Sequence, residues 1–405
     1  MSSLLSGVKS VLPAMTGNSA AFSAAGQAMA ELGVAGCIGM ACVEQSYLTP
    51  PMVSALTKTT FSILLPMFLG TSIIKTVHTY GLTWSSLVVP LMAIGQSLFL
   101  YGISRHLLLP MFGIDYDTQD GRSTAVCCAW GNLGVVPLIF CESLFRPPFE
   151  PAENLAKSHA QISLYLLGWS PFFWSFGRSI LVGIGNNDAR SKSYNDDRSI
   201  PKWETFVQRI KGLFPPPVVG VLVGLFLAAS PLKGLSINSS ERNAPLAVLY
   251  NTVQNFGRAA SPLSLLVLTA SLAIGAGRGG AGSAADLKRK VESLLEGEQG
   301  AGFLRRWACV SVARFILSPS LMLGLLSVLQ KGGIIGGYVE RPMLWFVLIL
   351  ESCMPPAQNS VIMLQVANKG HKAGEMAKFL FSVYATSMLP VVLILTLALR
   401  TFDLA

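Results

Sequence analysis

Ten apolar runs, each long enough to cross a lipid bilayer as a helix, dominate this sequence. The hydrocarbon core of a bilayer is about 30 Å thick, so a spanning helix needs about 20 mostly apolar residues. A helix also satisfies its backbone hydrogen bonds internally, as lipid requires. The runs therefore predict an all-α polytopic membrane protein with ten transmembrane helices. They are Ala20–Val43, Val53–Val77, Trp84–Leu108, Ser123–Phe145, Ser158–Ile184, Leu213–Ser230, Ala259–Ala276, Leu304–Leu329, Pro342–Val366 and Ala377–Leu399.

The low content of charged residues agrees with a membrane location. Charged residues make up 13% of the chain and hydrophobic residues 51%, whereas soluble domains carry roughly 25% charged residues. The net charge of +9 is spread between the apolar runs, which argues against a nucleic-acid-binding surface. All seven cysteines lie in apolar stretches without metal-ligand spacing, so we expect buried thiols, no metal and no cofactor. The expected surroundings are lipid.

Basic residues indicate the orientation of the helices, because they concentrate in cytoplasmic loops. The polar gap 185–212 after the fifth run is rich in them, and so are the gaps after the seventh and ninth runs. We therefore expect odd-numbered gaps in the cytosol and both termini, including the tail 1–19, on the other side. The glycosylation sequon Asn238–Ser240 falls on that non-cytosolic side. The basic residues of the three gaps are Arg190, Lys192, Arg198, Lys202, Arg209, Lys211, Arg278, Lys288, Arg289, Lys290, Arg305, Arg306, Lys369 and Lys372.

The two halves of the chain share features at matching positions. The third run ends in Arg105–Pro110 and the eighth contains Arg314–Pro319, and both segments read Arg, four residues, Pro. This recurrence predicts two five-helix repeats, 20–184 and 213–405, joined by the short cytosolic loop 185–212. An odd number of crossings reverses the direction of the chain, so the second repeat is expected to be inverted. Inverted repeats of this kind are common in secondary transporters.

Runs four and nine are each interrupted by a polar segment that contains proline, Gly131–Pro137 and Met354–Ser360. Proline lacks an N–H and clashes with the preceding turn, so nearby carbonyls lose their partners, which is tolerated in a membrane only inside protein or beside a wet cavity. Amides and free helix N-termini at this depth could hold an anionic, partly apolar solute. Alternatively, the breaks are kinks whose amides pair with neighbouring helices. The residues expected to bind substrate are Gly131, Asn132, Pro137, Pro355, Pro356, Gln358, Asn359 and Ser360.

Three charged residues lie in or beside these apolar runs. Glu142 and Glu351 follow and precede the two breaks, and each could carry a proton or lie solvated at the membrane surface. Arg314 could attract an anion, or it could pair with a carbonyl or an acid. The glycine-rich segment Gly275–Gly280 matches a dinucleotide-binding pattern but lacks a βαβ context, so we expect a flexible cytosolic linker. Since no nucleophile–base arrangement stands out, we expect no enzyme.

Four stretches resemble the auxin efflux carrier superfamily, and within it the PIN-LIKES branch of plants and algae. They are GNLGVVPLIFCES (Gly131–Ser143), PPPVVGVLVGLFLAASPLKGL (Pro215–Leu235), APL (Ala244–Leu246) and MPPAQN (Met354–Asn359). The resemblance implies ten helices in two inverted five-helix repeats, as in bile-acid symporters and antiporters, with broken helices four and nine crossing at the substrate. It also implies auxin transport across the endoplasmic reticulum membrane.

The chain departs from the branch at two places in these motifs. Val135 stands where the branch has a second Asn, and SVIMLQ (Ser360–Gln365) replaces its usual IGTMTQ. An amide and a hydroxyl are thereby missing from the site. We therefore expect the substrate to be auxin (indole-3-acetic acid) or a similar small organic carboxylate.

The sequence as a whole predicts a secondary transporter that works by elevator-type alternating access. Spans one, two, six and seven would form a scaffold, and the other helices would move relative to it. Two alternatives stay open, a sodium-coupled organic-anion symporter and a non-transporting membrane sensor that signals through Lys288–Lys290. The endoplasmic reticulum is the expected compartment, with the plasma membrane or a plastid membrane as alternatives. A homodimer is compatible with the apolar surface.

Overall fold

The computed structural model describes residues 19–81, 84–145, 152–183, 214, 216–231, 246–275, 297–367 and 369–404. All regular elements within these ranges are helical. Several features expected from the sequence lie outside the described residues: the tail 1–18, the loop 185–212, the sequon at Asn238, the lysines Lys288–Lys290 and the glycine-rich segment after Gly275.

In the described part of the first half of the chain, one helix, α2, is uninterrupted and four helices are composite. Most composite helices join two α-helices through a wide π-helical turn, labelled η. The elements are α2 (Ser19–Glu44), α3 (Pro50–Thr59), η1 (Thr60–Leu64), α4 (Leu65–Tyr80), α5 (Trp84–Ile103), η2 (Ser104–Leu108), α6 (Leu109–Met111), α7 (Gln119–Ala129), α8 (Val135–Leu144), α9 (Ala152–Phe172), η3 (Phe173–Gly177) and α10 (Arg178–Val182).

The second half repeats this mixture of straight and composite helices. Its elements are α13 (Pro216–Ala229), α15 (Ala247–Arg258), α16 (Ala260–Gly275), α18 (Gly297–Val312), η5 (Ala313–Leu317), α19 (Ser318–Lys331), α20 (Pro342–Ser352), α21 (Asn359–Val366) and α22 (Gly370–Thr401). The four segments Pro50–His78, Leu87–Met111, Gly300–Lys331 and His371–Thr401 are long and apolar enough to cross a membrane. The prediction of a helical protein with several membrane-length apolar helices is confirmed.

Three of the wide turns stand in the same register to a proline. η1, η2 and η5 each begin six residues before Pro66, Pro110 and Pro319. Because proline has no N–H, the helix loses a bond there, and the residue directly after each turn instead donates to the carbonyl five residues earlier. Arg105 and Arg314 are the second residues of η2 and η5, so the Arg-x₄-Pro segments have one local structure in both halves.

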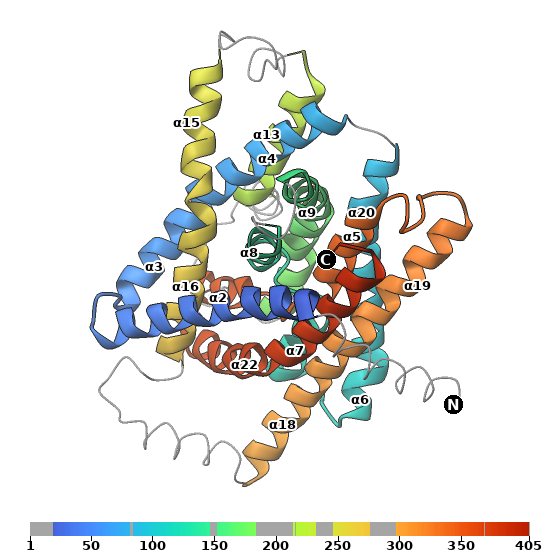
Figure 1. Cartoon of the computed structure of the whole chain (residues 1–405). Coiled ribbons are helices and arrows are strands. Elements are labelled where there is room, and N and C mark those ends of the chain that lie inside the picture. The colour runs from blue at the N-terminus through green and yellow to red at the C-terminus, as the bar shows by residue number, and fades with distance from the viewer. Residues whose placement is uncertain are drawn as a thin grey trace, which may run out of the picture.

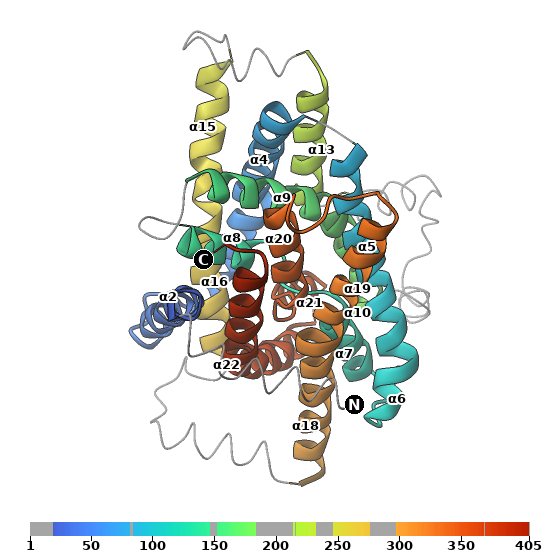
Figure 2. The ribbon, with the colours of Figure 1, turned by 45° about the vertical axis from the view of Figure 1, so that its right-hand side comes forward.

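Helices α2, α3–α4, α13 and α15–α16 pack on one another. α13 lies along α4, and α16 contacts α2 and α3. Figure 1 shows α15 and α16 as one nearly continuous column that α2 crosses. A separate apolar cluster of Val43, Val53, Val267 and Ala270 joins α2, α3 and α16. In Figure 2, α20 and α21 lie in the middle of the molecule, between α16 on one side and α5 and α19 on the other.

Glycines bring α13 into close contact with α4. A Cβ atom at Gly220 would overlap the carbonyl oxygen of Pro66, and one at Gly224 would lie 2.6 Å from the carbonyl oxygen of Gly70. Gly220 and Gly224 form a Gly-x₃-Gly pair, a spacing that lets membrane helices approach closely.

Gly220→Ala is therefore expected to lower stability by about 1–3 kcal/mol, because the added methyl group meets backbone atoms that can move only with their helix. A lower melting temperature of the purified protein measures this effect. Gly95→Ala in α5 is the control, since a Cβ there meets no atom within 4 Å. Equal melting temperatures for the two variants would show that the α4–α13 contact is not as tight as described.

Candidate functional site

The two interrupted helices meet at their breaks. α7 ends at Ala129 and α8 begins at Val135, while α20 ends at Ser352 and α21 begins at Asn359. Asn132 N–H donates to the Pro355 carbonyl at 2.7 Å, and Ala357 N–H donates to the Trp130 carbonyl at 3.0 Å. A short antiparallel bridge pairs Gly131 with Pro356 between these bonds. Backbone groups that the breaks release from their helices thus satisfy one another across the crossing.

A tyrosine from the last helix holds this crossing together. Asn132 Nδ2 donates to the Tyr384 hydroxyl at 2.7 Å, and that hydroxyl donates to the Pro356 carbonyl at 3.0 Å. Tyr384 lies on α22 and joins the break in span four to the break in span nine. The Asn132 amide is buried and is bound by protein, which is the arrangement that the kink alternative predicts for this residue.

Tyr384→Phe is expected to cost about 1–3 kcal/mol, because it leaves a buried amide group and a buried carbonyl without the shared hydroxyl. The melting temperature should fall and substrate transport should weaken with it. Tyr250→Phe is a matched control, because the Tyr250 hydroxyl makes only long bonds of 3.3 Å, one donated to the Thr71 carbonyl and one accepted from Gln254 Nε2. A Tyr384→Phe protein as stable as Tyr250→Phe would contradict the bridging role.

Arg314, in η5, stabilises the crossing by a hydrogen bond to its backbone. Its side chain is 2% exposed, and its Nε donates to the Met354 carbonyl at 2.8 Å. Gly131 makes room for the guanidinium group, since a Cβ at that position would overlap Nη2. Of the two roles that the sequence left open for Arg314, pairing with a carbonyl is the one observed.

A second group of hydrogen bonds fixes the end of α20. Ser318 Oγ, four residues beyond Arg314, donates to the Ser352 carbonyl at 2.7 Å. Gln96 Nε2 donates to Ser318 Oγ at 2.9 Å, and the Tyr165 hydroxyl donates to Gln96 Oε1 at 2.6 Å. Residues from α5, α9 and α19 thus position the carbonyl that precedes the break in span nine.

The two acids that flank the breaks have opposite environments. Glu351 is 0% exposed, and neither carboxylate oxygen has a hydrogen-bond partner among the described residues. The Glu142 side chain is 52% exposed, and its Oε1 lies 4.0 Å from His159 Nε2. Glu142 is therefore exposed and Glu351 is fully buried, and a proton-carrying role for either acid stays a prediction.

A cavity of about 40 Å³ lies where the crossing meets the helices around α16. Its polar lining comes from two amides of the crossing, Gln358 and Asn359, and from hydroxyl groups on α3, η1 and α16. Thr60 is 5% exposed, and its hydroxyl has no hydrogen-bond partner among the described residues. The hydroxyl residues are Thr57, Thr60, Ser264 and Ser271, and the apolar lining is Phe61, Leu65, Val267, Val361, Ile362, Ala377 and Leu380.

Six of the eight residues expected to bind substrate thus fall into two groups. Gln358 and Asn359 line the cavity. Gly131, Asn132, Pro355 and Pro356 build the crossing itself. Of the remaining two, Pro137 lies in the first turn of α8, and Ser360 is buried in α21 with a hydroxyl that has no partner among the described residues.

Sequence reasoning missed the hydroxyl residues of spans two and seven. Thr57 and Thr60 lie one helical turn apart, and Ser264 and Ser271 lie two turns apart, so each pair follows one face of its helix. This helical spacing of hydroxyl residues, close to the prolines Pro66 and Pro262, is the sequence pattern that could have indicated a polar face at the cavity.

No ionisable side chain lines this cavity in the described part of the chain. The cavity therefore offers hydrogen bonds from amides and hydroxyls, beside an apolar wall. Its volume has room for a few water molecules at most.

Comparison with known proteins gives the family. A family described as membrane transport protein matches residues 25–395. Protein PIN-LIKES 3 of Arabidopsis thaliana is 24% identical over 276 residues, which cover 60% of this chain and 64% of that protein. Protein PIN-LIKES 1 of the same plant is 24% identical over 287 residues, covering 64% and 54%, and Protein PIN-LIKES 7 is 25% identical over 279 residues, covering 59% and 63%.

The chain spans less than two thirds of the length of each of these relatives. The matched family consists of transport proteins, so the expectation that the chain is not an enzyme is confirmed. The resemblance to PIN-LIKES proteins is confirmed as well. The chain therefore belongs to the membrane transport protein family, the family of the auxin efflux carriers.

Proposed function

We propose that this protein is a secondary transporter of a small organic carboxylate, auxin or a similar acid, and that the cavity at the crossing is part of its substrate site. The observation that carries the proposal is the position of this cavity. It lies between the broken helices and the group formed by α2, α3–α4, α13 and α15–α16. A binding site between two helix groups can change its exposure when one group slides along the other.

The chemistry of the lining suits a carboxylate with an apolar body. Asn359 and the hydroxyls of Thr60 and Ser264 can donate hydrogen bonds to carboxylate oxygens. The N-terminus of α21 adds a partial positive charge, and the buried guanidinium of Arg314 lies behind the crossing. The apolar wall would contact the ring or chain of the acid.

The proposed motion has support from the close packing of α13 on α4 and of α16 on α2. Spans one, two, six and seven form the scaffold, and the crossing moves past α16 and η1 with the remaining helices. The shared wide turn at the two Arg-x₄-Pro segments supports the proposed arrangement of ten spans in two inverted repeats.

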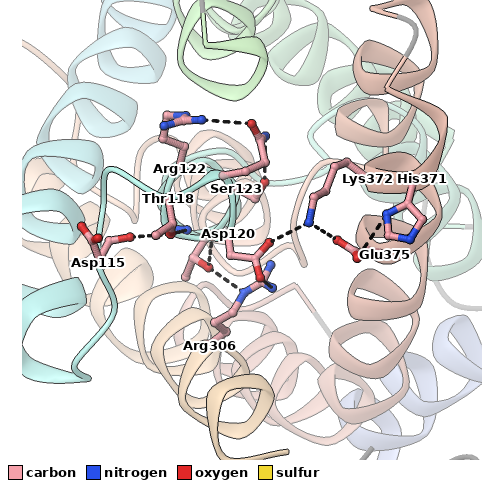
Figure 3. A network of polar contacts seen from close by, with 12 residues as sticks. Asp115, Thr118, Asp120, Arg122, Ser123, Arg306, His371, Lys372 and Glu375 are labelled. Atoms are coloured by element: carbon pink, nitrogen blue, oxygen red, sulfur yellow. Dashed lines mark hydrogen bonds and ion pairs between the residues drawn. The ribbon is translucent and has the colours of Figure 1, made fainter. Parts of the chain in front are cut away.

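The proposed orientation has support from residues that gather at one end of the molecule. Figure 3 shows Asp120, Arg306 and Lys372, which follow or lie in the expected cytosolic gaps three, seven and nine. Arg306 Nη1 lies 2.9 Å from Asp120 Oδ2, and Lys372 Nζ lies 4.0 Å from Asp120 Oδ1. Tyr338, from the expected non-cytosolic gap eight, contacts Phe402 near the C-terminus.

We place both termini on the non-cytosolic side, because the basic residues of the chain concentrate in the odd-numbered gaps. We place the protein in the endoplasmic reticulum membrane, because its relatives are PIN-LIKES proteins and its polar gap is short. The plasma membrane and a plastid membrane are the alternatives. A homodimer would bury part of the exposed apolar surface.

Uptake of radiolabelled indole-3-acetate and of simple dicarboxylates into proteoliposomes tests the transport function. We expect uptake without sodium, and at least about a tenfold loss in Asn359→Ala, since a lost hydrogen bond to a charged group costs about 1.5–3 kcal/mol. Asn255→Ala, an exposed amide on α15, is the control. Equal uptake by Asn359→Ala and the wild type would refute the site.

The same assay separates the two alternatives. A sodium-coupled symporter would require sodium for uptake, but no carboxylate lines the cavity in the described residues. A sensor would bind the acid without moving it across the membrane.

A further inference from the structure

Two ionisable side chains are buried behind the crossing. Glu351 belongs to the last turn of α20 and lies two residues before the break. Arg314 reaches the break from η5, with its Nε on the Met354 carbonyl. Among the described residues, both carboxylate oxygens of Glu351 and the Nη2 of Arg314 lack a hydrogen-bond partner. A buried charge is costly unless it is paired and hydrogen-bonded, so two such groups in one place call for a functional explanation.

Arg314 is a basic residue at the same end of α20 as Glu351, because its Nε donates to the carbonyl of Met354, three residues after Glu351. α20 packs against α8, α9, α19 and α22, and the ionisable groups that these elements place around the pair are otherwise uncharged thiols and phenols. Those groups are Cys141 on α8, Tyr165 on α9, Cys353 directly after α20, Tyr384 on α22, and Cys127 and Cys128 on α7, which packs against η5. The charge behind the crossing is therefore set by Arg314 and by whether Glu351 holds a proton.

In this arrangement the net charge beside the crossing depends on whether the Glu351 carboxylate holds a proton. With Glu351 ionised, the pair has no net charge, and an anion in the cavity gains little from Arg314. When a proton from the aqueous phase adds to a carboxylate oxygen of Glu351, the pair has a charge of +1, and its attraction for an anion is strong in a medium of low dielectric constant. No bond in the substrate changes in this step.

We propose that Glu351 takes up a proton when the anion binds at the crossing, so that the carrier moves the organic anion and a proton in the same direction. This inference rests on the proposed transport function and adds its driving force. Glu142, the other acid beside a break, has no part in it, because its side chain is 52% exposed and water can solvate either protonation state.

The proposal can be measured, because binding of the anion and binding of the proton are thermodynamically linked. If anion binding favours protonated Glu351, then protonation favours anion binding by the same factor, and couplings between sites are commonly 5–150-fold. We expect the wild type to bind indole-3-acetate about tenfold more tightly near pH 6 than near pH 8.5. The probe is ionised over this whole range, so its own titration does not contribute.

The experiment adds indole-3-acetate to the purified full-length protein in weakly buffered detergent solution that contains a pH-indicator dye. The wild type should take up a proton as it binds, up to about one for each anion at intermediate pH. Glu351→Gln, which resembles the protonated acid, should bind with the same affinity at every pH and take up no proton. Glu142→Gln is the matched control and should behave as the wild type.

The outcomes separate this inference from the transport function. Binding by the wild type without proton uptake, or proton uptake that persists in Glu351→Gln, overturns the proton coupling and leaves the carrier function standing. Absence of binding by the wild type removes both. Should Glu351→Gln not fold, Glu351→Asp keeps the titratable group, and the wild type and Glu142→Gln still decide by proton uptake alone.

Discussion

Gly131→Ala is expected to abolish transport of the organic acid while leaving the protein in the membrane. The added Cβ would overlap Nη2 of Arg314 and would lie 2.9 Å from its Cζ. The guanidinium can move away only by giving up its bond to the Met354 carbonyl, which costs about 1.5–3 kcal/mol for a charged donor. The antiparallel bridge between Gly131 and Pro356 would open with it. We expect uptake into proteoliposomes to fall at least about a hundredfold, because a small displacement of binding groups costs this much.

Gly134→Ala is the control for this substitution, since it lies in the same break and a Cβ there would meet only Leu166 Cδ2 at 4.0 Å. Its uptake should stay within about twofold of the wild type. Comparable uptake by the two alanine variants would mean that the contact between Gly131 and Arg314 does not shape the site.

Arg314→Met is expected to cause the largest loss of stability. It leaves the buried Met354 carbonyl without its donor and removes one of the two ionisable groups that are buried behind the crossing. Removing one partner of a buried charge pair commonly costs about 3–5 kcal/mol, whereas replacing both partners by apolar residues is often close to neutral. The melting temperature should therefore fall strongly in Arg314→Met and recover in part in the double variant Arg314→Met/Glu351→Met.

Arg105→Met is the matched control, because Arg105 holds the same register in η2 but is exposed. Its guanidinium lies over the Tyr116 ring at 4.3 Å and makes a long bond of 3.4 Å to the Tyr101 hydroxyl. Such exposed contacts contribute about 0.5–1 kcal/mol. A double variant less stable than Arg314→Met would contradict the electrostatic relation of the two buried residues.

The breaks could be predicted from the sequence because their cause is local. Proline, glycine and asparagine interrupt a helix by their own chemistry, so Gly131–Pro137 and Met354–Ser360 were identified within otherwise apolar runs. The Arg-x₄-Pro segments were visible for the same reason. That both become wide turns follows from the missing N–H of the proline.

The contacts of the site could not be predicted in the same way, because they depend on which helix faces come together. Glu142 and Glu351 are the same residue type beside equivalent breaks, yet one is exposed and the other is fully buried. Tyr384 is one of several hydroxyl residues on its helix, and nothing in the sequence indicates that it is the one that bridges the crossing. Such pairings arise only from tertiary packing.

The central claim is that the cavity beside the crossing holds the substrate, and protection of thiols introduced into its wall tests it most directly. Ser264→Cys and Ser271→Cys place a thiol on the α16 side of the cavity with little change in size. Both are made in a background without Cys37 and Cys42, the native cysteines that are not buried. Ser327→Cys, an exposed position on α19, is the control.

Saturating indole-3-acetate should slow modification of the thiol in Ser264→Cys and in Ser271→Cys by a small methanethiosulfonate at least about tenfold, in line with exclusion of the reagent by a bound ligand. The rate at the control position should not change. Unchanged modification rates at both wall positions, in protein that still transports indole-3-acetate, would place the substrate elsewhere and contradict the account.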